Sequence, residues 1–484
     1  MNWDVASKVP PKIGRTKMSF YRMLIGGALI DGDAEMDVIN PATGKLLASC
    51  PRGSAAQLDA AVAAAKGAQP GWAACSLAER QDALAGLADS LESQSEGFAR
   101  LLTMEQGKPL AEATAEVAYT VAFIRHFATK GPRVEVLEIG PGRRIEMHRR
   151  PLGVVGAIIP WNFPLLLIAF KLPPALVTGN TIVVKPSPTT PLTALKLGEL
   201  CAEFFPPGVV NIVSDANDLG GRLSAHPDVA KISFTGSTST GAMVMQAAAE
   251  TIKRVTLELG GNDAAIVLPD IDPAAVAPAL FRSSFMNAGQ VCLAIKRLYV
   301  HQDIYDEVCD RLAALATDAV VDDGLMQGAQ IGPLQNRMQF QKVKGFLADA
   351  HAAGKVIAGG KAIDRPGYFI EPTIVRDVTD GDRIVDIEQF GPILPIIKFS
   401  DPEDALARAN ASPLGLGGSV WSKDVRRATD LAARMDVGMA WVNKHLDFGP
   451  GIPFGGAKQS GIGMELGDAG LAEFTQLSVL NIAL

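Results

Sequence analysis

The chain has 484 residues, too many for one ordinary hydrophobic core, so two or three domains are expected. Its formal net charge of -7 argues against nucleic acid as a main partner, because phosphate binding needs a basic surface. Its five cysteines are scattered and odd in number, which predicts no disulfide framework and favours a reducing compartment, so we expect a cytoplasmic protein.

Two segments, 1–19 and 152–170, have some features of an export signal or a membrane span. Residues 1–19 are mildly basic but lack a continuous apolar core, so we interpret them as a tail and not as a signal peptide. The stretch 152–170 is uncharged and approaches transmembrane length. Pro160, Asn162 and Pro164 interrupt it, which favours a buried strand, a turn and the start of a buried helix. No membrane partner is therefore expected.

The order of helices and strands predicts the fold class. Amphipathic helices are expected early, over 59–68 and 77–96. From Gly153 onward, short apolar runs alternate with helical segments, which is typical of a parallel sheet covered on both faces. The first series has strands over 154–159, 181–184, 209–213, 231–234 and 264–268, with helices over 190–204 and 241–253. The second has strands over 297–300, 355–358, 393–398 and 419–421, with helices over 304–316, 335–353 and 402–409. The sequence predicts two α/β lobes whose boundary lies near 258–262.

Two segments outside these lobes suggest an interface between subunits. Residues 133–150 alternate apolar and charged residues around Pro141-Gly142, which predicts an extended hairpin too small for its own core. The last residues, 477–484, are nearly uncharged and strand-like. Both are candidates for pairing with another subunit.

The pairing of Cys292 with Glu258 is the most informative feature for chemistry. Cys292 ends the segment 285–292, and Glu258 is the lone carboxylate of Leu257–Asn262. A free cysteine with a pKa of ~8.5 is mostly protonated at neutral pH, so a nucleophilic thiol needs a base such as this carboxylate. The small residues before Cys292 suit a tight loop whose N–H groups approach a substrate oxygen. In isolation, such a cysteine is more often a buried apolar residue.

Other residues with chemical potential are individually weak signals. The segment Thr235–Gly241 joins a strand to a helix and suits a pyrophosphate, although a plain turn explains it equally well. Lys185 ends an apolar strand, where open α/β sheets bind ligands, but a surface lysine is the simpler interpretation. Asn162 can donate to an oxyanion or serve only as a turn residue. Taken alone, the segment that contains Glu388 and Phe390 is typical of an ordinary loop.

Seven segments together resemble the NAD(P)-dependent aldehyde dehydrogenase superfamily, of the hydrolytic, non-acylating type. They occur in family order and cover nearly the whole chain, namely Pro160–Pro164, Lys185-Pro186, Phe234–Ser237, Leu257–Asn262, Gly289–Cys292, Glu388–Pro392 and Pro453–Gly461. The resemblance implies a three-part α/β protein with a dinucleotide-binding parallel-sheet domain, an α/β catalytic domain and a small β oligomerisation arm, forming a homodimer or homotetramer. The expected divisions are a tail at 1–19, an NAD(P)-binding domain at 20–132 and 151–258, a catalytic domain at 259–460, and an arm with the C-terminal segment at 133–150 and 461–484.

The resemblance also implies catalytic roles for five residues. Cys292 would attack the aldehyde to form a thiohemiacetal and then a thioester, and Asn162 with the Cys292 backbone N–H would form the oxyanion hole. Glu258 would be the general base that activates water for hydrolysis. Lys171 and Glu465 match positions that pass protons outward, although a structural salt bridge is nearly as good an explanation.

The implied cofactor is NAD or NADP, and no metal site is expected. Ser237 would meet the pyrophosphate, Lys185 the adenosine ribose, Glu388 the nicotinamide ribose and Phe390 the nicotinamide. The remaining expected cofactor-binding residues are Ile158, Pro160, Trp161, Ser187, Gly220, Phe234, Gly236 and Leu259. Many NAD-preferring members carry a glutamate where this chain has Pro188. Its absence removes a barrier to NADP without creating affinity, because no arginine replaces it, so NAD is slightly favoured.

The expected substrate pocket is apolar. Its lining by resemblance is Phe163, Leu166, Leu167, Phe170, Met286, Val291, Leu293, Leu446 and Phe448, some of which are equally explained as core packing. Relatives that oxidise succinate semialdehyde place arginines where this chain has Phe170 and Met286. An unpaired substrate carboxylate would cost several kcal/mol there, so we expect an aromatic or medium-chain aliphatic aldehyde.

Alternative functions remain open at this point. A semialdehyde dehydrogenase acting on a polar or dicarboxylic substrate is the first, and a non-catalytic binding protein on the same fold is the second. A CoA-acylating enzyme is disfavoured because Glu258 is retained. A cofactor-independent thiol hydrolase ranks last, since the six histidines show no partnership with Cys292.

Overall fold

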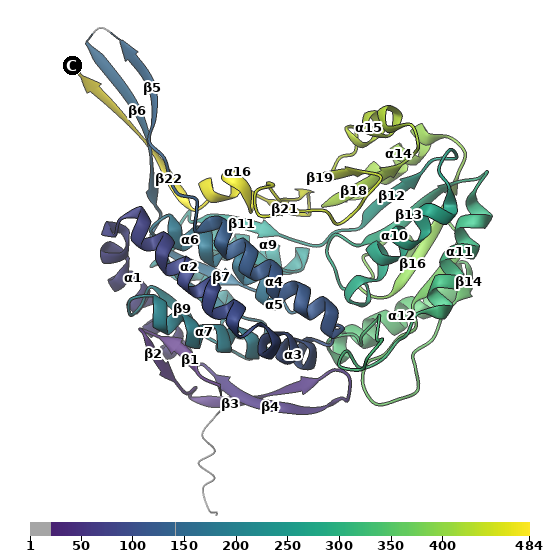
Figure 1. The fold of residues 1–484 in the computed structure, drawn as a ribbon, viewed down its shortest axis with the longest axis horizontal. Helices are drawn as coiled ribbons and strands as arrows, with labels where there is room; N and C mark the ends of the chain where they lie inside the picture. Colours follow the sequence, from purple (N-terminus) through teal and green to yellow (C-terminus); the bar gives the residue numbers. More distant parts are fainter. Residues whose placement is uncertain (1–20, 141) are drawn as a thin grey trace, which may run out of the picture.

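The computed structural model describes residues 21–140 and 142–484. The expected tail at 1–19 and Pro141 of the expected hairpin lie outside the described residues. Figure 1 shows two α/β lobes joined side by side and a narrow β arm that projects from the first lobe. The mixed α/β class with parallel sheets is as predicted.

The N-terminal region packs hairpins and helices onto the first lobe. The predicted helix 59–68 lies within α1, whereas the predicted helix 77–96 runs past the end of α2 at Ser93 into the start of α3. The serine before each of α1 and α2 forms a reciprocal capping box, with Gln57 and Glu79 respectively. The hairpins and helices α3 and α4 were not predicted. The bounds are β1 Met23–Ile25, β2 Ala28–Ile30, β3 Ala34–Asn40, β4 Lys45–Arg52, α1 Ala55–Ala74, α2 Leu77–Ser93, α3 Ser95–Gln106 and α4 Leu110–Phe127.

The first sheet has the strand order β2-β1-β9-β8-β7-β10-β11-β21. The chain runs from β7 to β8 and β9 on one side, while β10 and β11 lie on the other, so β7 marks the point where the strand order reverses. Open α/β sheets bind ligands at the carboxyl ends of strands beside such a point. The bounds are β7 Val154–Ile158, α5 Pro164–Ala169, α6 Leu172–Val177, β8 Thr181–Lys185, α7 Leu192–Phe204, β9 Val210–Ile212, α8 Gly220–Ala225, β10 Val229–Thr235, α9 Thr238–Ala249, β11 Arg254–Glu258 and β21 Gly461–Ile462.

The second sheet has the order β14-β15-β16-β13-β12-β18-β19. The segment 259–262 joins the end of β11 in the first sheet to the start of β12 in the second, so an interior strand of each sheet meets at the lobe boundary. The bounds are β12 Asp263–Val267, α10 Pro273–Phe285, β13 Ile295–His301, α11 Tyr305–Asp318, α12 Arg337–Ala353, β14 Lys355–Ala358, β15 Thr373–Val378, α13 Arg383–Asp386, β16 Ile393–Phe399, α14 Pro402–Asn410, β18 Gly417–Trp421, α15 Val425–Ala432 and β19 Met439–Val442. A further two-stranded pair joins β17 Leu414–Gly415 to β20 Ala457–Lys458.

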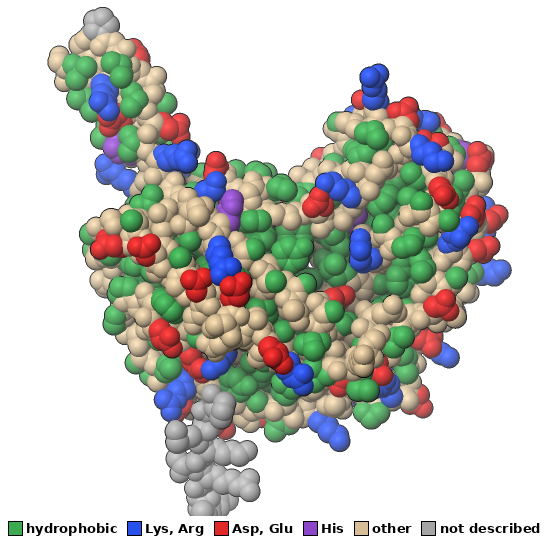
Figure 2. All heavy atoms as spheres, in the orientation of Figure 1, with side chains coloured by type: hydrophobic (Ala, Val, Ile, Leu, Met, Phe, Trp, Pro, Cys, Tyr) green, Lys and Arg blue, Asp and Glu red, His purple; other side chains and the backbone are tan. Residues whose placement is uncertain are grey.

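The arm consists of three antiparallel strands. The expected hairpin forms β5 (Glu135–Gly140) and β6 (Arg143–Pro151), and the C-terminal strand β22 (Thr475–Ala483) pairs along β6 after the short helix α16 (Gly467–Ala472). Apolar side chains remain exposed on it, as Figure 2 shows, with Ile139 70% and Val479 55% exposed. No helix in the described part of the chain is long and apolar enough to cross a membrane. The stretch 152–170 instead forms β7, a turn and α5, as predicted.

Candidate active site

Cys292 lies in a tight loop between α10 and β13. The loop begins with the 3₁₀ turn Met286–Gly289, in which Asn287 and Ala288 have φ of 49° and 55° and Gly289 has φ of 72°. Non-glycine residues rarely adopt this left-handed conformation, so the loop needs strong support from its surroundings. Gly289 is also required by space, because a Cβ there would lie 2.3 Å from the Gly391 oxygen.

Buried side chains hold the backbone on either side of Cys292. Lys296 Nζ donates to the oxygens of Val291 at 2.8 Å and Cys292 at 2.6 Å. The His445 ring contacts the Leu293 oxygen at 2.7 Å, and burial lowers the pKa of His445 to about 3, so the ring is neutral. With three successive carbonyls occupied, the loop is fixed in a single arrangement before any substrate binds.

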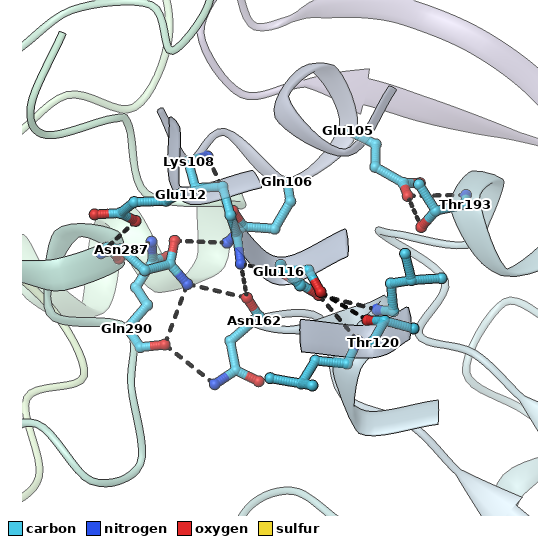
Figure 3. Close-up of polar contacts among 12 residues, drawn as sticks. Glu105, Gln106, Lys108, Glu112, Glu116, Thr120, Asn162, Thr193, Asn287 and Gln290 are labelled. Atoms are coloured by element: carbon cyan, nitrogen blue, oxygen red, sulfur yellow. Dashed lines mark hydrogen bonds and ion pairs between the residues drawn. The ribbon is translucent and has the colours of Figure 1, made fainter. Parts of the chain in front are cut away.

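Asn162 approaches this loop from the first lobe. It follows β7, is buried, and its Nδ2 donates to the Gln290 oxygen at 3.1 Å. Its backbone oxygen accepts from Lys108 Nζ at 2.9 Å and from Asn287 Nδ2 at 3.0 Å. Figure 3 shows Lys108, from the turn between α3 and α4, and Asn287, from the nucleophile loop (residues 286–292), meeting at the Asn162 oxygen. The expected oxyanion donor and nucleophile are thereby brought together.

The Cys292 thiol is protonated at neutral pH in this arrangement. Cys292 is half-buried, and burial raises its pKa to about 12, with Lys296 acting in the opposite direction. A nucleophilic thiolate therefore requires that a base remove the proton as the reaction proceeds.

Glu258 ends β11 and is buried with its side chain largely unpartnered. Neither of its carboxylate oxygens has a hydrogen-bond partner among the described residues. Burial raises its pKa well above the ordinary value, the nearby charge of Glu465 raises it further, and Lys171 opposes both. Fully buried Lys171 pairs with Glu465 and donates to Thr235 Oγ1 at 2.7 Å. The three predicted ionisable residues thus form one electrostatic group.

The residues expected to bind the cofactor line the carboxyl edge of the first sheet. Ile158 is in register with both Lys185 and Phe234, so the ends of β7, β8 and β10 lie together. Ser237 caps α9, and its side chain accepts from the Thr240 N–H. The N-terminus of this 12-residue helix, with the glycine turn before it, suits a pyrophosphate. Lys185 Nζ pairs with Asp215 Oδ1 at 2.7 Å, and both are buried.

A second set of expected cofactor residues lies across the lobe boundary. Glu388 Oε1 accepts from the Gly261 N–H at 3.2 Å and lies 3.3 Å from Lys296 Nζ. The Phe390 ring meets the Trp161 ring edge to face, with centroids 5.4 Å apart. The backbone oxygen of Phe390 accepts from Gln339 Nε2 at 2.8 Å, which supports its left-handed φ of 52°.

The remaining expected cofactor residues lie around these two groups. Ser187 is buried and its hydroxyl contacts Thr189 Oγ1 at 3.2 Å. Leu259 is also buried, and its backbone N–H donates to the Ser460 oxygen at 2.9 Å. Gly220 begins α8, where a Cβ would lie 3.5 Å from Lys185 Cε. Pro160 and Gly236 lie in the turns that follow β7 and β10.

The expected pocket residues share one hydrophobic cluster with Cys292. Phe163, Met286, Leu446 and Phe448 are partly buried against it, while the other five members, Leu166, Leu167, Phe170, Val291 and Leu293, are buried within it. The Phe170 ring stacks on Phe123 with centroids 5.2 Å apart and meets the edges of Phe448 and Phe454 at 6.2 Å and 5.7 Å. Phe123 and Phe454 were not predicted.

Several charged residues of the site were not identified from the sequence. Lys296 supports the nucleophile loop, Lys108 holds Asn162, and Asp215 pairs with Lys185. Lys342 lies close enough to Glu388 for that carboxylate to oppose the lowering of its pKa by burial. Lys296 had a local signal, since it and Arg297 are the two charged residues of the otherwise apolar run 291–300, where a charge is costly to bury. The others depend on contacts distant in sequence.

Comparisons with known proteins show which family the chain resembles over nearly its whole length. The model of the aldehyde dehydrogenase family matches residues 29–480. The chain is 38% identical to the NADP-dependent succinate-semialdehyde dehydrogenase of Escherichia coli, covering 98% of this chain and 100% of that protein. It is 39% identical to phenylacetaldehyde dehydrogenase of Pseudomonas fluorescens, covering 96% of each. The NAD⁺ complex of a Bacillus cereus aldehyde dehydrogenase superposes with a TM-score of 0.94 at 36% identity, covering 96% of each chain.

Proposed function

Because this chain belongs to the aldehyde dehydrogenase family, we propose that it oxidises an apolar aldehyde, aromatic or medium-chain aliphatic, to the carboxylic acid with NAD as the preferred acceptor. The observation that carries this proposal is that Asn162 donates to the Cys292 loop at the Gln290 oxygen and that the Glu258 charge acts on Cys292, which packs against the same hydrophobic cluster as the aromatic rings. We further propose a cytoplasmic enzyme that assembles as a homodimer or homotetramer through the exposed apolar arm.

The first half of the reaction forms a bond between Cys292 and the aldehyde. Glu258, acting directly or through a water, removes the thiol proton, and Cys292 Sγ attacks the carbonyl carbon to give a thiohemiacetal. Asn162 Nδ2 and the Cys292 N–H stabilise the oxyanion that develops. Because Lys296 and His445 already hold the loop carbonyls, these donors need no reorganisation during the attack.

The second half releases the acid. Lys185, Ser237 and Glu388 would hold NAD(P), which when bound would accept the hydride that the thiohemiacetal loses as it becomes a thioester. After the thiol proton has left Glu258, the carboxylate takes a proton from water, which attacks the thioester carbonyl and expels the thiolate. The Lys171–Glu465 pair lies within electrostatic reach of Glu258 and provides a route for that proton to leave.

The aromatic cluster favours an apolar substrate. Phe123, Phe170, Phe448 and Phe454 form a continuous set of ring contacts, with Phe448 and Phe454 centroids 6.0 Å apart. A substrate carboxylate placed against these rings would lose its hydration without gaining a cation. The alternative function is that of a semialdehyde dehydrogenase, which the 38% identity to the Escherichia coli enzyme favours.

Asp215 supports the preference for NAD. Its carboxylate pairs with Lys185 at 2.7 Å and accepts from the Leu219 N–H at 2.8 Å, so it is fixed beside the expected adenosine ribose site. The paired charges leave Lys185 with little attraction for a 2′-phosphate, and the carboxylate repels one. Asp215 therefore supplies the negative charge that Pro188 does not.

The function is tested by following nucleotide reduction with benzaldehyde, phenylacetaldehyde, hexanal, betaine aldehyde and succinate semialdehyde, each with NAD and with NADP. We expect the highest kcat/KM for the apolar aldehydes with NAD. A preference for succinate semialdehyde would refute the substrate class and leave the mechanism intact. If the folded protein reduces neither nucleotide with any of the aldehydes, the non-catalytic alternative replaces the proposal.

The cofactor preference is tested separately with Asp215→Gly. The ratio of kcat/KM for NADP to that for NAD should rise about tenfold or more, as expected for removing one repulsive charge worth about 1.4 kcal/mol. Asp218→Asn is the matched control, because Asp218 lies in the same loop but is exposed and pairs with Arg52. An unchanged ratio in Asp215→Gly would exclude Asp215 as the discriminating residue.

A further inference from the structure

The oxyanion donor and the nucleophile loop come from distant parts of the chain, yet a third segment contacts both. Asn162 follows β7, Asn287 lies in the loop before Cys292, and the segment 106–116 joins the end of α3 to the first turns of α4. Side chains of this segment hydrogen-bond to both neighbours, as Figure 3 shows. None of the seven family-like motifs includes it.

Lys108 and Glu116 hold the backbone at Asn162 and just after it. Lys108 is fully buried, pairs with Glu116, and donates from Nζ to the Asn162 oxygen at 2.9 Å. Its ammonium also lies 3.7 Å from the centre of the Phe163 ring. Glu116 Oε1 accepts the first N–H groups of α5, from Leu165 at 3.1 Å and Leu166 at 3.2 Å. One ion pair therefore fixes the turn that presents the Asn162 amide.

Asn287 connects the Asn162 turn and the segment 106–116 to the loop that carries Cys292. Its Nδ2 donates to the same Asn162 oxygen at 3.0 Å, and its Oδ1 accepts from Gln106 Nε2 at 3.0 Å. Its backbone N–H donates to the Glu112 carboxylate at 3.0 Å. These contacts support a residue whose φ of 49° is unfavourable for a side chain, so the loop conformation depends on the same segment.

We propose that the Lys108–Glu116 pair is a positioning device that aligns the Asn162 oxyanion donor with Cys292. Neither residue touches the reacting atoms, and both act through Asn162. A buried ion pair is weak as a source of stability, since well-packed apolar residues often serve as well or better. Here the pair hydrogen-bonds to the Asn162 carbonyl and to the first two N–H groups of α5, in the segment that carries the oxyanion donor. These contacts give the pair a use beyond stability. This inference rests on the proposed dehydrogenase function.

The test is a double-mutant cycle between the pair and Asn162. Lys108→Met combined with Glu116→Gln removes the donor to Asn162 together with both charges of the pair, and keeps an acceptor for the α5 amides. We expect kcat to fall about 10- to 100-fold, less than the full loss of an oxyanion donor, with KM within about threefold. In an Asn162→Ala background, the same replacement should cost less than about threefold.

A merely structural role gives a different result. Equal losses of kcat in both backgrounds would overturn the inference, because the pair would then act independently of Asn162. Arg222→Met with Asp59→Asn, an exposed pair remote from these contacts, serves as the control and should leave kcat unchanged. A wild-type protein without dehydrogenase activity would refute the proposed function instead of this inference.

Hydrogen exchange tests the inference without reference to activity. In the Lys108→Met, Glu116→Gln protein, peptides covering 160–166 and 286–292 should exchange faster than in the wild type, while peptides from the second sheet should be unchanged. Unchanged exchange in both site peptides would overturn the inference even if the variant were less active.

Discussion

The loop that carries Cys292 and the carboxylate of Glu258 are held in opposite ways. The backbone oxygens from Gln290 to Leu293 are each contacted by a buried side chain, namely Asn162, Lys296 for two of them, and His445. Both carboxylate oxygens of Glu258, in contrast, lack a hydrogen-bond partner among the described residues. The hydrogen-bond acceptors of the Cys292 loop therefore have partners, whereas those of the Glu258 carboxylate have none in the described part of the chain.

The difference follows from what each group must do. A nucleophile and its oxyanion donors gain from being fixed before the reaction, because no reorganisation then accompanies the attack. A general base must accept and release protons, so its lone pairs have to remain free for the thiol and for water. A buried carboxylate without partners is costly, and its persistence here fits a functional requirement better than a structural one.

Loss of the nucleophile should have the largest effect. Cys292→Ala should lower aldehyde oxidation by at least about 10⁴-fold, since no later step proceeds without the thioester. Nucleotide reduction measures the loss, and Cys75→Ala, at another partly exposed cysteine, should retain full activity. Substantial activity in Cys292→Ala would contradict covalent catalysis.

Loss of the base should stop both halves of the reaction, because Glu258 accepts the proton of the thiol and later that of water. Glu258→Gln should reduce steady-state kcat by about 10³-fold, because it keeps the shape of the side chain but cannot accept a proton. Glu250→Gln, on the exposed end of α9, is the control. If kcat falls less than about tenfold, another group activates the water.

Alkylation of Cys292 reports the state of the thiol directly. Because burial raises its pKa to about 12, the rate of iodoacetamide labelling without cofactor should rise about tenfold per pH unit between roughly pH 7 and 10. Mass spectrometry of the Cys292 peptide gives the rate. A plateau below about pH 8 would show that the thiolate already forms in the resting protein.

The pH dependence of kcat should report the environment of Glu258. Its pKa is raised, so kcat should fall as the pH drops through that raised value and the base becomes neutral. Glu465→Gln removes a negative charge that raises this pKa and leaves Lys171, which lowers it, so the acid limb should shift to lower pH. A shift to higher pH would contradict the electrostatic assignment.

Much of the fold was predictable because buried parallel strands have a simple sequence pattern. β7 and β8 are buried along their whole length and read as short apolar runs. β11 was missed, since it begins with the exposed Arg254 and becomes a strand through its register with β10. α9 begins at Thr238 rather than at the predicted residue 241, because the Ser237 side chain caps it.

The site was predictable where its residues lie in local motifs. Cys292 and Glu258 stand in recognisable segments, and the structure brings them together with Asn162. Lys108 has no such signal, because the oxygen it binds is 54 residues away in the chain. Asp215 follows a strand of three residues, and its role depends on pairing with Lys185 from the neighbouring strand. Contacts between residues this far apart in the chain cannot be predicted from a local sequence pattern.

The division between a fixed nucleophile and a free base is tested most directly by trapping the intermediate. The Glu258→Gln variant is mixed with NAD and benzaldehyde and quenched in acid within the time of one wild-type turnover. Mass spectrometry then gives the mass of the peptide that contains Cys292. Because Glu258 is the base that removes the thiol proton, the account predicts neither a benzoyl thioester on Cys292 nor a burst of NADH in the variant, whereas the wild type produces NADH. A benzoyl thioester formed together with about one equivalent of NADH in the folded variant would show that another group deprotonates Cys292, and would contradict the account.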